Sequence, residues 1–183
     1  MKFGSECQNI ARRGVLRVFG WAALSLALPF APAAWASAPR SVSLYHTHTG
    51  EKLSLVYYEG GEYVADAVAS LNSMLRDFRT GEVGQFDPAL FDQLYALNLA
   101  CGEGTYEVVS AFRSEQTNKM LREQSRRVAK DSLHVRGRAI DVRLSGRDTR
   151  RLREAALALK QGGVGYYPRS NFVHLDTGAV RSW

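Results

Sequence analysis

Polar and apolar residues alternate in two short stretches, Ser41–Tyr45 and Leu53–Tyr58, which are rich in β-branched and aromatic residues. A period of two predicts strands that bury one face. Thr49-Gly50 lies between the stretches and is typical of a tight turn. We therefore expect a β-hairpin over these residues.

Apolar residues recur at helical spacing in three later stretches, and each predicts a helix with one buried face. The stretches contain Val64, Val68, Leu71, Leu75 and Phe78; then Leu90, Phe91, Leu94 and Leu97; then Leu152, Ala155, Ala156 and Leu159. Asp87-Pro88 favours the start of the second helix, Gly102 its end, and Gly162-Gly163 the end of the third. Ser114–Ser125 is polar but compatible with a further helix.

Further strand candidates are Tyr106–Phe112, Ala139–Leu144, Val164–Tyr167 and Asn171–Leu175. The last two are too close in the chain for a helical crossover, so they are expected to pair antiparallel. The succession of elements predicts a single α+β domain whose mainly antiparallel sheet packs against helices.

Residues 1–36 differ from the rest of the chain. Arg12, Arg13 and Arg17 precede an uncharged run, Val18–Leu28. The run is shorter than the roughly 20 apolar residues that span a bilayer, but it suits the apolar part of an export signal. We expect cleavage after Ala36, which leaves residues 37–183 as the mature domain without a stable membrane anchor.

The arginine pair in Ala11–Arg17 resembles a twin-arginine export signal, although Ala11 and Val15 depart from the usual residues. An ordinary secretory signal with a chance arginine pair is the alternative. Either signal predicts an exported protein, and we expect it in the periplasm.

The net charge of the chain limits the classes of binding partner that we expect. The chain has 24 basic and 18 acidic residues, and four of the basic and one of the acidic residues lie in residues 1–36. The mature domain therefore has 20 basic and 17 acidic residues, a net charge of +3. This scattered excess does not indicate nucleic-acid binding, but it is compatible with an anionic polymer such as peptidoglycan. The sequence leaves the oligomeric state open.

Two histidines and an aspartate suggest the chemistry. His134 and Asp141 flank Gly137, which permits a turn that returns the chain, while His174 lies on a later predicted strand. Three protein ligands with a fourth position for water are what a hydrolytic zinc site needs. We therefore predict that His134, Asp141 and His174 bind Zn²⁺.

The pattern SxHxxGxAxD occurs as Ser132, His134, Gly137, Ala139 and Asp141. It resembles the signature of the D-alanyl-D-alanine carboxypeptidase-like zinc peptidases. Two further segments extend the resemblance: Ser110–Ser114 with Thr117-Asn118, and Gly162–Gly178, which is similar to the branch containing murein endopeptidase K. The resemblance implies the hedgehog/D,D-peptidase fold and an exported zinc enzyme that hydrolyses peptide cross-links in peptidoglycan.

The resemblance also implies residue roles. It makes His134, Asp141 and His174 the zinc ligands, and Arg113 the arginine that supports the reacting carbonyl, a contribution of about 3 kcal/mol in a dry site. Many relatives carry an acid three residues before the last histidine, where this chain has Asn171. Asp176 could replace that acid as general base, or it could orient His174; the sequence leaves both roles open.

Other functions also remain open. The enzyme could instead be a D,D- or L,D-carboxypeptidase that trims stem peptides, and the amide at Asn171 allows a non-catalytic, zinc-stabilised peptidoglycan-binding domain. The cleaved cross-link could join D-alanine to diaminopimelate or two diaminopimelates. His46 and His48 are expected on an exposed hairpin edge without a catalytic role.

Overall fold

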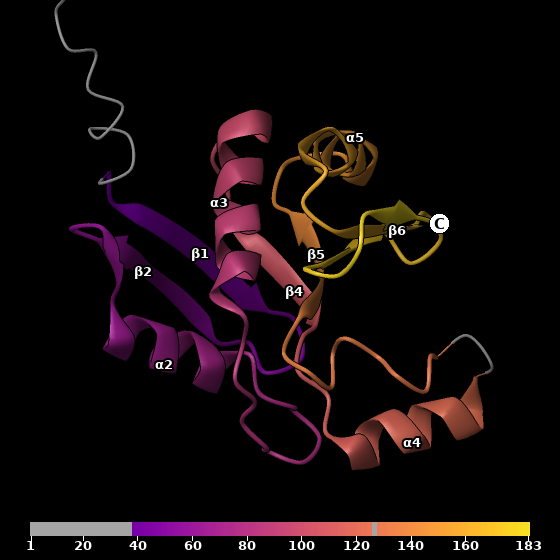
Figure 1. Cartoon of the computed structure of the whole chain (residues 1–183). Helices are drawn as coiled ribbons and strands as arrows, with labels where there is room; N and C mark the ends of the chain where they lie inside the picture. Colours follow the sequence, from indigo (N-terminus) through magenta and orange to yellow (C-terminus); the bar gives the residue numbers. More distant parts are fainter. Residues whose placement is uncertain (1–37, 126–127) are drawn as a thin grey trace, which may run out of the picture. The chain divides into compact units, whose positions relative to one another are not determined.

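The computed structural model describes residues 38–125 and 128–183, so the expected export signal lies outside the described residues. The strands are β1 (Arg40–His46), β2 (Lys52–Glu59), β3 (Glu62–Tyr63), β4 (Tyr106–Ser110), β5 (Ala139–Leu144), β6 (Gly163–Tyr167), β7 (Phe172–Asp176) and β8 (Arg181–Ser182). The helices in this part of the chain are α2 (Ala65–Met74), α3 (Pro88–Cys101), α4 (Glu115–Gln124) and α5 (Thr149–Leu159) (Figure 1).

The eight strands found within the described residues join one sheet in the order β3-β2-β1-β4-β5-β7-β6-β8. The β1–β4 and β6–β8 pairs are parallel, and the other five pairs are antiparallel. This arrangement confirms the predicted α+β class, the mainly antiparallel sheet and the hairpin formed by β1 and β2. The two-residue strands β3 and β8 were not predicted, because they are too short to show a period.

The centre of the sheet is buried on both faces. Ile140 and Val142 of β5 and Leu175 of β7 join the same hydrophobic core as Leu90 of α3 and Leu152 of α5. Because successive strand residues point to opposite faces, Asp141 and His174 lie on the face away from those helices. The sheet thus places the polar residues of β5 and β7 together, apart from the core.

Three elements end clearly before their predicted boundaries. The helix α2 ends at Met74, so Phe78 lies beyond it, and β4 ends at Ser110. The helix α5 ends at Leu159 and is capped by Lys160, whose φ of 52° is left-handed, rather than by Gly162-Gly163. None of the helices within 38–125 and 128–183 combines the length and apolar character that crossing a bilayer demands.

Asp77, just after α2, forms hydrogen bonds with Ser114 at the start of α4 and so holds the two segments together. Its buried carboxylate accepts hydrogen bonds from the backbone N of Ser114 at 2.9 Å and from its Oγ at 2.7 Å. Ser114 caps α4 and directly follows Arg113. Burial acts to raise the pKa of Asp77, but hydrogen bonds from Thr117, Ser114 and Arg79 outweigh it and lower the pKa to about 2.

We expect Asp77→Asn to lower the free energy of unfolding at pH 7 by about 2 kcal/mol. Because the folded-state pKa is depressed, the stabilisation is present above about pH 4, the unfolded value, and is lost as the pH falls through about 2. Urea denaturation at pH 7 and pH 3 should show the difference between wild type and variant roughly halved at pH 3. The exposed Asp66→Asn is the matched control, and an equal loss there would contradict the assignment.

Candidate metal centre

Strand register brings the first two site residues together. Asp141 of β5 and His174 of β7 are direct cross-strand partners, so their side chains leave the sheet side by side. The Nδ1 atom of His174 lies 2.8 Å from Oδ1 of Asp141. This contact follows from the pairing of two predicted strands.

His134 reaches the same point from the turn before β5. Gly137 in this turn has a φ of 62°, and a Cβ there would lie 1.9 Å from the backbone oxygen of Gln85. Glycine is therefore required both for the backbone angle and for the space. The turn places Nε2 of His134 3.2 Å from Nδ1 of His174 and 3.4 Å from Oδ1 of Asp141.

Hydrogen bonds on the outer nitrogens assign the tautomer of each imidazole. Nδ1 of His134 lies 2.7 Å from the backbone oxygen of Ala111, which can only accept, so this nitrogen carries the proton. Nε2 of His174 lies 3.1 Å from Oδ2 of Asp176 and likewise donates. Without a metal, Nδ1 of His174 donates to the carboxylate of Asp141; once that proton is lost, as metal binding requires, both rings present a lone pair on the nitrogen nearest Asp141.

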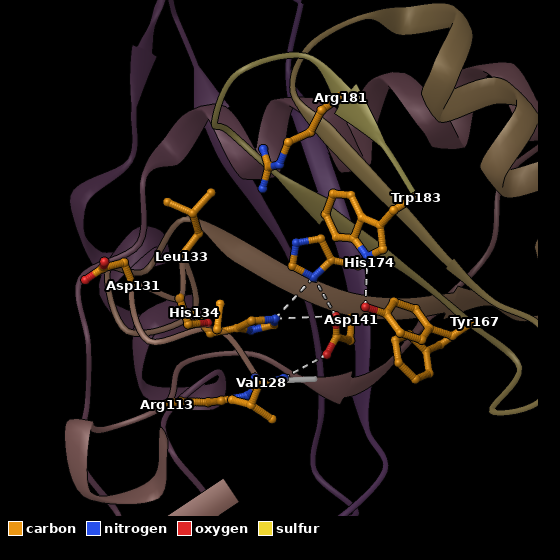
Figure 2. Close-up of a pocket in the computed structure, with 13 residues that line it drawn as sticks. Arg113, Val128, Asp131, Leu133, His134, Asp141, Tyr167, His174, Arg181 and Trp183 are labelled. Atoms are coloured by element: carbon orange, nitrogen blue, oxygen red, sulfur yellow. Dashed lines mark hydrogen bonds and ion pairs between the residues drawn. The ribbon is translucent and has the colours of Figure 1, made fainter. Parts of the chain in front are cut away.

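Two lone pairs and a carboxylate oxygen therefore converge, which is a donor set suited to a cation. Zinc bonds to histidine nitrogen of about 2.0–2.1 Å imply ligand atoms about 3.3 Å apart in a tetrahedron. The distances found here, 2.8, 3.2 and 3.4 Å, are close to that spacing. The three residues thus fit a metal ion (Figure 2).

The pKa values follow from burial and from mutual contact. Burial lowers the pKa of His134, while burial of His174 is outweighed by hydrogen bonds to Asp141 and Asp176, which raise its pKa. Burial would raise the pKa of Asp141, but the charges and hydrogen bonds of both histidines hold it well below its usual range. Asp141 is therefore ionised, and a bound metal would compete with a proton for His174.

Arg113 lies in the same pocket as the three donors. Its Nη2 donates to Oδ2 of Asp141 at 3.0 Å, and its Nε donates to Oγ of Ser110 at 3.0 Å. Two of its five N–H groups are used in these contacts, so the guanidinium keeps donors for a substrate oxygen. Its position is compatible with the predicted support of the reacting carbonyl, a role that stays a prediction.

Asp176 contacts His174 on the side of the ring away from Asp141. Its side chain is fully buried, and it accepts hydrogen bonds from His174, from the backbone N of Gly163 and Gly178, and from Arg181. Burial acts to raise its pKa, but these donors hold the pKa well below the usual range. Of the two roles considered for Asp176, this geometry favours orienting His174 over accepting a proton from water.

Asn171 ends the turn between β6 and β7, outside the pocket. Its φ of 51° is left-handed, a conformation that asparagine tolerates better than most residues, and its Oδ1 accepts a hydrogen bond from Thr149 at 3.0 Å. The side chain is therefore engaged in shaping the hairpin turn and the start of α5.

His46 is buried rather than exposed, which corrects one expectation for the hairpin. Its Nδ1 accepts hydrogen bonds from the backbone N of His48 at 3.3 Å and of Thr49 at 3.4 Å. His48 stacks on Phe78. Both histidines contact their own hairpin and its neighbours, and neither lines the pocket around Asp141.

The pocket of about 460 Å³ also contains residues that sequence reasoning did not select. Trp183 and Arg181 line it, and Tyr167, for which either a cleft or a core position was open, lies in the pocket (Figure 2). Strand alternation allowed one of Tyr166 and Tyr167 to face the site, but no local signal identified the last residues of the chain.

Comparisons with known proteins show which chains this one resembles. A model of the family described as peptidoglycan L,D-endopeptidase MepK matches residues 34–183. Peptidoglycan L,D-endopeptidase MepK of Escherichia coli strain K12 is 43% identical over 177 residues, covering 94% of this chain and 97% of that protein. A probable peptidoglycan L,D-endopeptidase MepK of Haemophilus influenzae is 42% identical over 147 residues, or 79% of each chain. No solved structure matches significantly.

We expect Asp176→Asn to weaken metal binding about 10- to 100-fold, because the partner that orients a metal-bound imidazole is changed. Chelator competition with zinc as the probe measures this affinity, and His134→Ala should bind far more weakly still. Asp66→Asn, an exposed substitution of the same kind, should bind as wild type does. An unchanged affinity in the folded Asp176 variant would contradict the orienting role.

Proposed function

Because the chain belongs to the peptidoglycan L,D-endopeptidase MepK family, we propose that it is a zinc-dependent endopeptidase that hydrolyses peptide cross-links of the bacterial cell wall. The observation that carries the proposal is the convergence of His134, Asp141 and His174 on one point of an open pocket. Zinc is the metal that best suits two imidazoles and a carboxylate with one position left for water.

The relatives are described as L,D-endopeptidases, and we carry this bond class over to the chain. An L,D bond joins the carbonyl of an L-centre to the amine of a D-centre. Of the two cross-links considered, the one between two diaminopimelates fits, because the carbonyl of D-alanine belongs to a D-centre. We therefore propose the diaminopimelate cross-link as the substrate.

A bound zinc ion would lower the pKa of a coordinated water to about 7 and polarise the scissile carbonyl. The chain's own residues then have separate tasks. Arg113 donates N–H groups toward the carbonyl oxygen as negative charge develops there. Asp176 Oδ2 and the backbone oxygen of Ala111 hold the outer N–H groups of His174 and His134, which keeps both inner lone pairs directed at the metal.

Digestion of purified sacculi tests the function. The zinc-loaded protein should convert cross-linked dimers to monomers, and a chelator or His134→Ala should abolish the conversion. Arg113→Lys should lower kcat about 100- to 1000-fold, because the fork of N–H donors at the carbonyl is lost. The exposed Arg150→Lys on α5 is its matched control.

The products separate this function from its alternatives. Loss of terminal residues from uncross-linked stems, with dimers left intact, would identify a carboxypeptidase. Binding to sacculi without release of any peptide, by zinc-loaded protein, would identify a binding domain. Either pattern would contradict the endopeptidase.

We also propose that residues 1–36 export the chain to the periplasm through the twin-arginine route. The basic segment, the apolar run and the start of the family match at residue 34 support this proposal. A reporter fused to residues 1–36 should be exported, and Arg12→Lys with Arg13→Lys should retain it in the cytoplasm. Unchanged export of that variant would indicate an ordinary secretory signal.

A further inference from the structure

Tyr167 is a phenol at the candidate metal centre that the proposed mechanism does not yet use. It lies on β6 and lines the pocket with Arg113, Asp141 and His174. Gly165, two residues earlier on the same face, is the cross-strand partner of His174, so this face of β6 borders the metal ligands. Tyr166 points the other way, where Arg153 of α5 lies 5.4 Å from the centre of its ring.

Two neighbours hold the Tyr167 side chain. Its ring stacks on that of Phe172 with centroids 4.6 Å apart and planes 19° from parallel. Its hydroxyl oxygen accepts a hydrogen bond of 2.9 Å from Nε1 of Trp183. Because an indole N–H can only donate, this bond leaves the proton of the phenol for donation elsewhere. Figure 2 shows the hydroxyl pointing toward His174 and Asp141.

Trp183 is fixed beside the candidate metal ligands by backbone hydrogen bonds and ring contacts. Its backbone N donates to the oxygen of Val164 at 3.2 Å, and its backbone O accepts from the N of Tyr166 at 3.0 Å. Its ring lies 5.2 Å from that of His174, and a Cβ on Gly165 would approach it to 2.7 Å. The absent side chain at Gly165 therefore makes room for the indole that contacts Tyr167.

We propose that Tyr167 is a catalytic residue whose hydroxyl donates a hydrogen bond to the oxygen of the tetrahedral intermediate, and that Trp183 is its positioning residue. The inference rests on the proposed peptidase function. A donor held in place before the reaction stabilises developing charge without reorganisation, and Arg113 alone would otherwise supply the side-chain donors. The Trp183 contact leaves the phenol proton directed at the reacting carbonyl.

The test is Tyr167→Phe in the zinc-loaded full-length protein, with Tyr166→Phe as the matched control on the opposite face of β6. We expect kcat on a cross-linked dimer to fall about 100- to 1000-fold in the Tyr167 variant, with KM changed less than threefold. Affinity for a phosphinate analogue of the scissile bond should fall by a similar factor. Zinc content and thermal unfolding should match those of wild type, as should every property of the control.

Trp183→Phe keeps an aromatic ring against His174 but removes the N–H. We expect kcat to fall about tenfold in the wild-type background and to stay unchanged when Phe already replaces Tyr167, because the N–H acts only through the phenol. A purely structural role for Trp183 would lower activity equally in both backgrounds. That result would overturn the positioning role.

Other outcomes are equally distinct. A Tyr167→Phe variant with kcat within threefold of wild type, or with unchanged phosphinate affinity, overturns the catalytic role. Loss of zinc from that variant overturns it also, because the residue would then support the metal centre. If wild-type protein cleaves no cross-link, the proposed function fails; if wild type cleaves and the Tyr167 variant cleaves as well, only this inference fails.

Discussion

The structure depends on the hydrogen bonds that lie behind the two metal-facing imidazoles. The backbone oxygen of Ala111 and the carboxylate of Asp176 accept the outer N–H groups, so the inner nitrogen of His134, and that of His174 once it gives up its second proton, presents a lone pair beside ionised Asp141. Acceptors facing one another in a buried site repel unless a proton or cation lies between them. The fold therefore maintains an arrangement that a metal ion stabilises.

Long-range contacts hold that arrangement in place. The pairing of Asp141 with His174 is a consequence of sheet register, and a slip of β7 by one residue would turn His174 toward the hydrophobic core. Asp176 is fixed from three sides by backbone N–H groups and by the guanidinium of Arg181. Rigid strands thus give the site a precision that a loop-borne site would lack.

Sequence patterns could predict most of the fold and the three candidate ligands, because strand alternation and the SxHxxGxAxD spacing are local features. They could not predict where α2 ends: the apolar repeat continues to Phe78, but the chain leaves the helix and Asp77 binds Ser114 instead. They also missed Trp183, because its contacts with Tyr167 and His174 come from distant positions in the chain. Local periodicity carries no information on such pairings.

The glycines of Gly162–Gly165 make room for neighbouring residues in the structure, although the first two were expected to end a helix. Gly162-Gly163 suggested a helix end, yet α5 ends before them, at Leu159, and Lys160 caps it. A Cβ on Gly162 would lie 1.7 Å from the backbone oxygen of Asp176, and one on Gly163 would lie 2.4 Å from its carboxylate. Gly165 likewise leaves space for the Trp183 ring, which a Cβ at this position would approach to 2.7 Å. These glycines therefore leave room for Asp176, which contacts His174, and for Trp183, which contacts Tyr167, so close packing helps to set the geometry of the site.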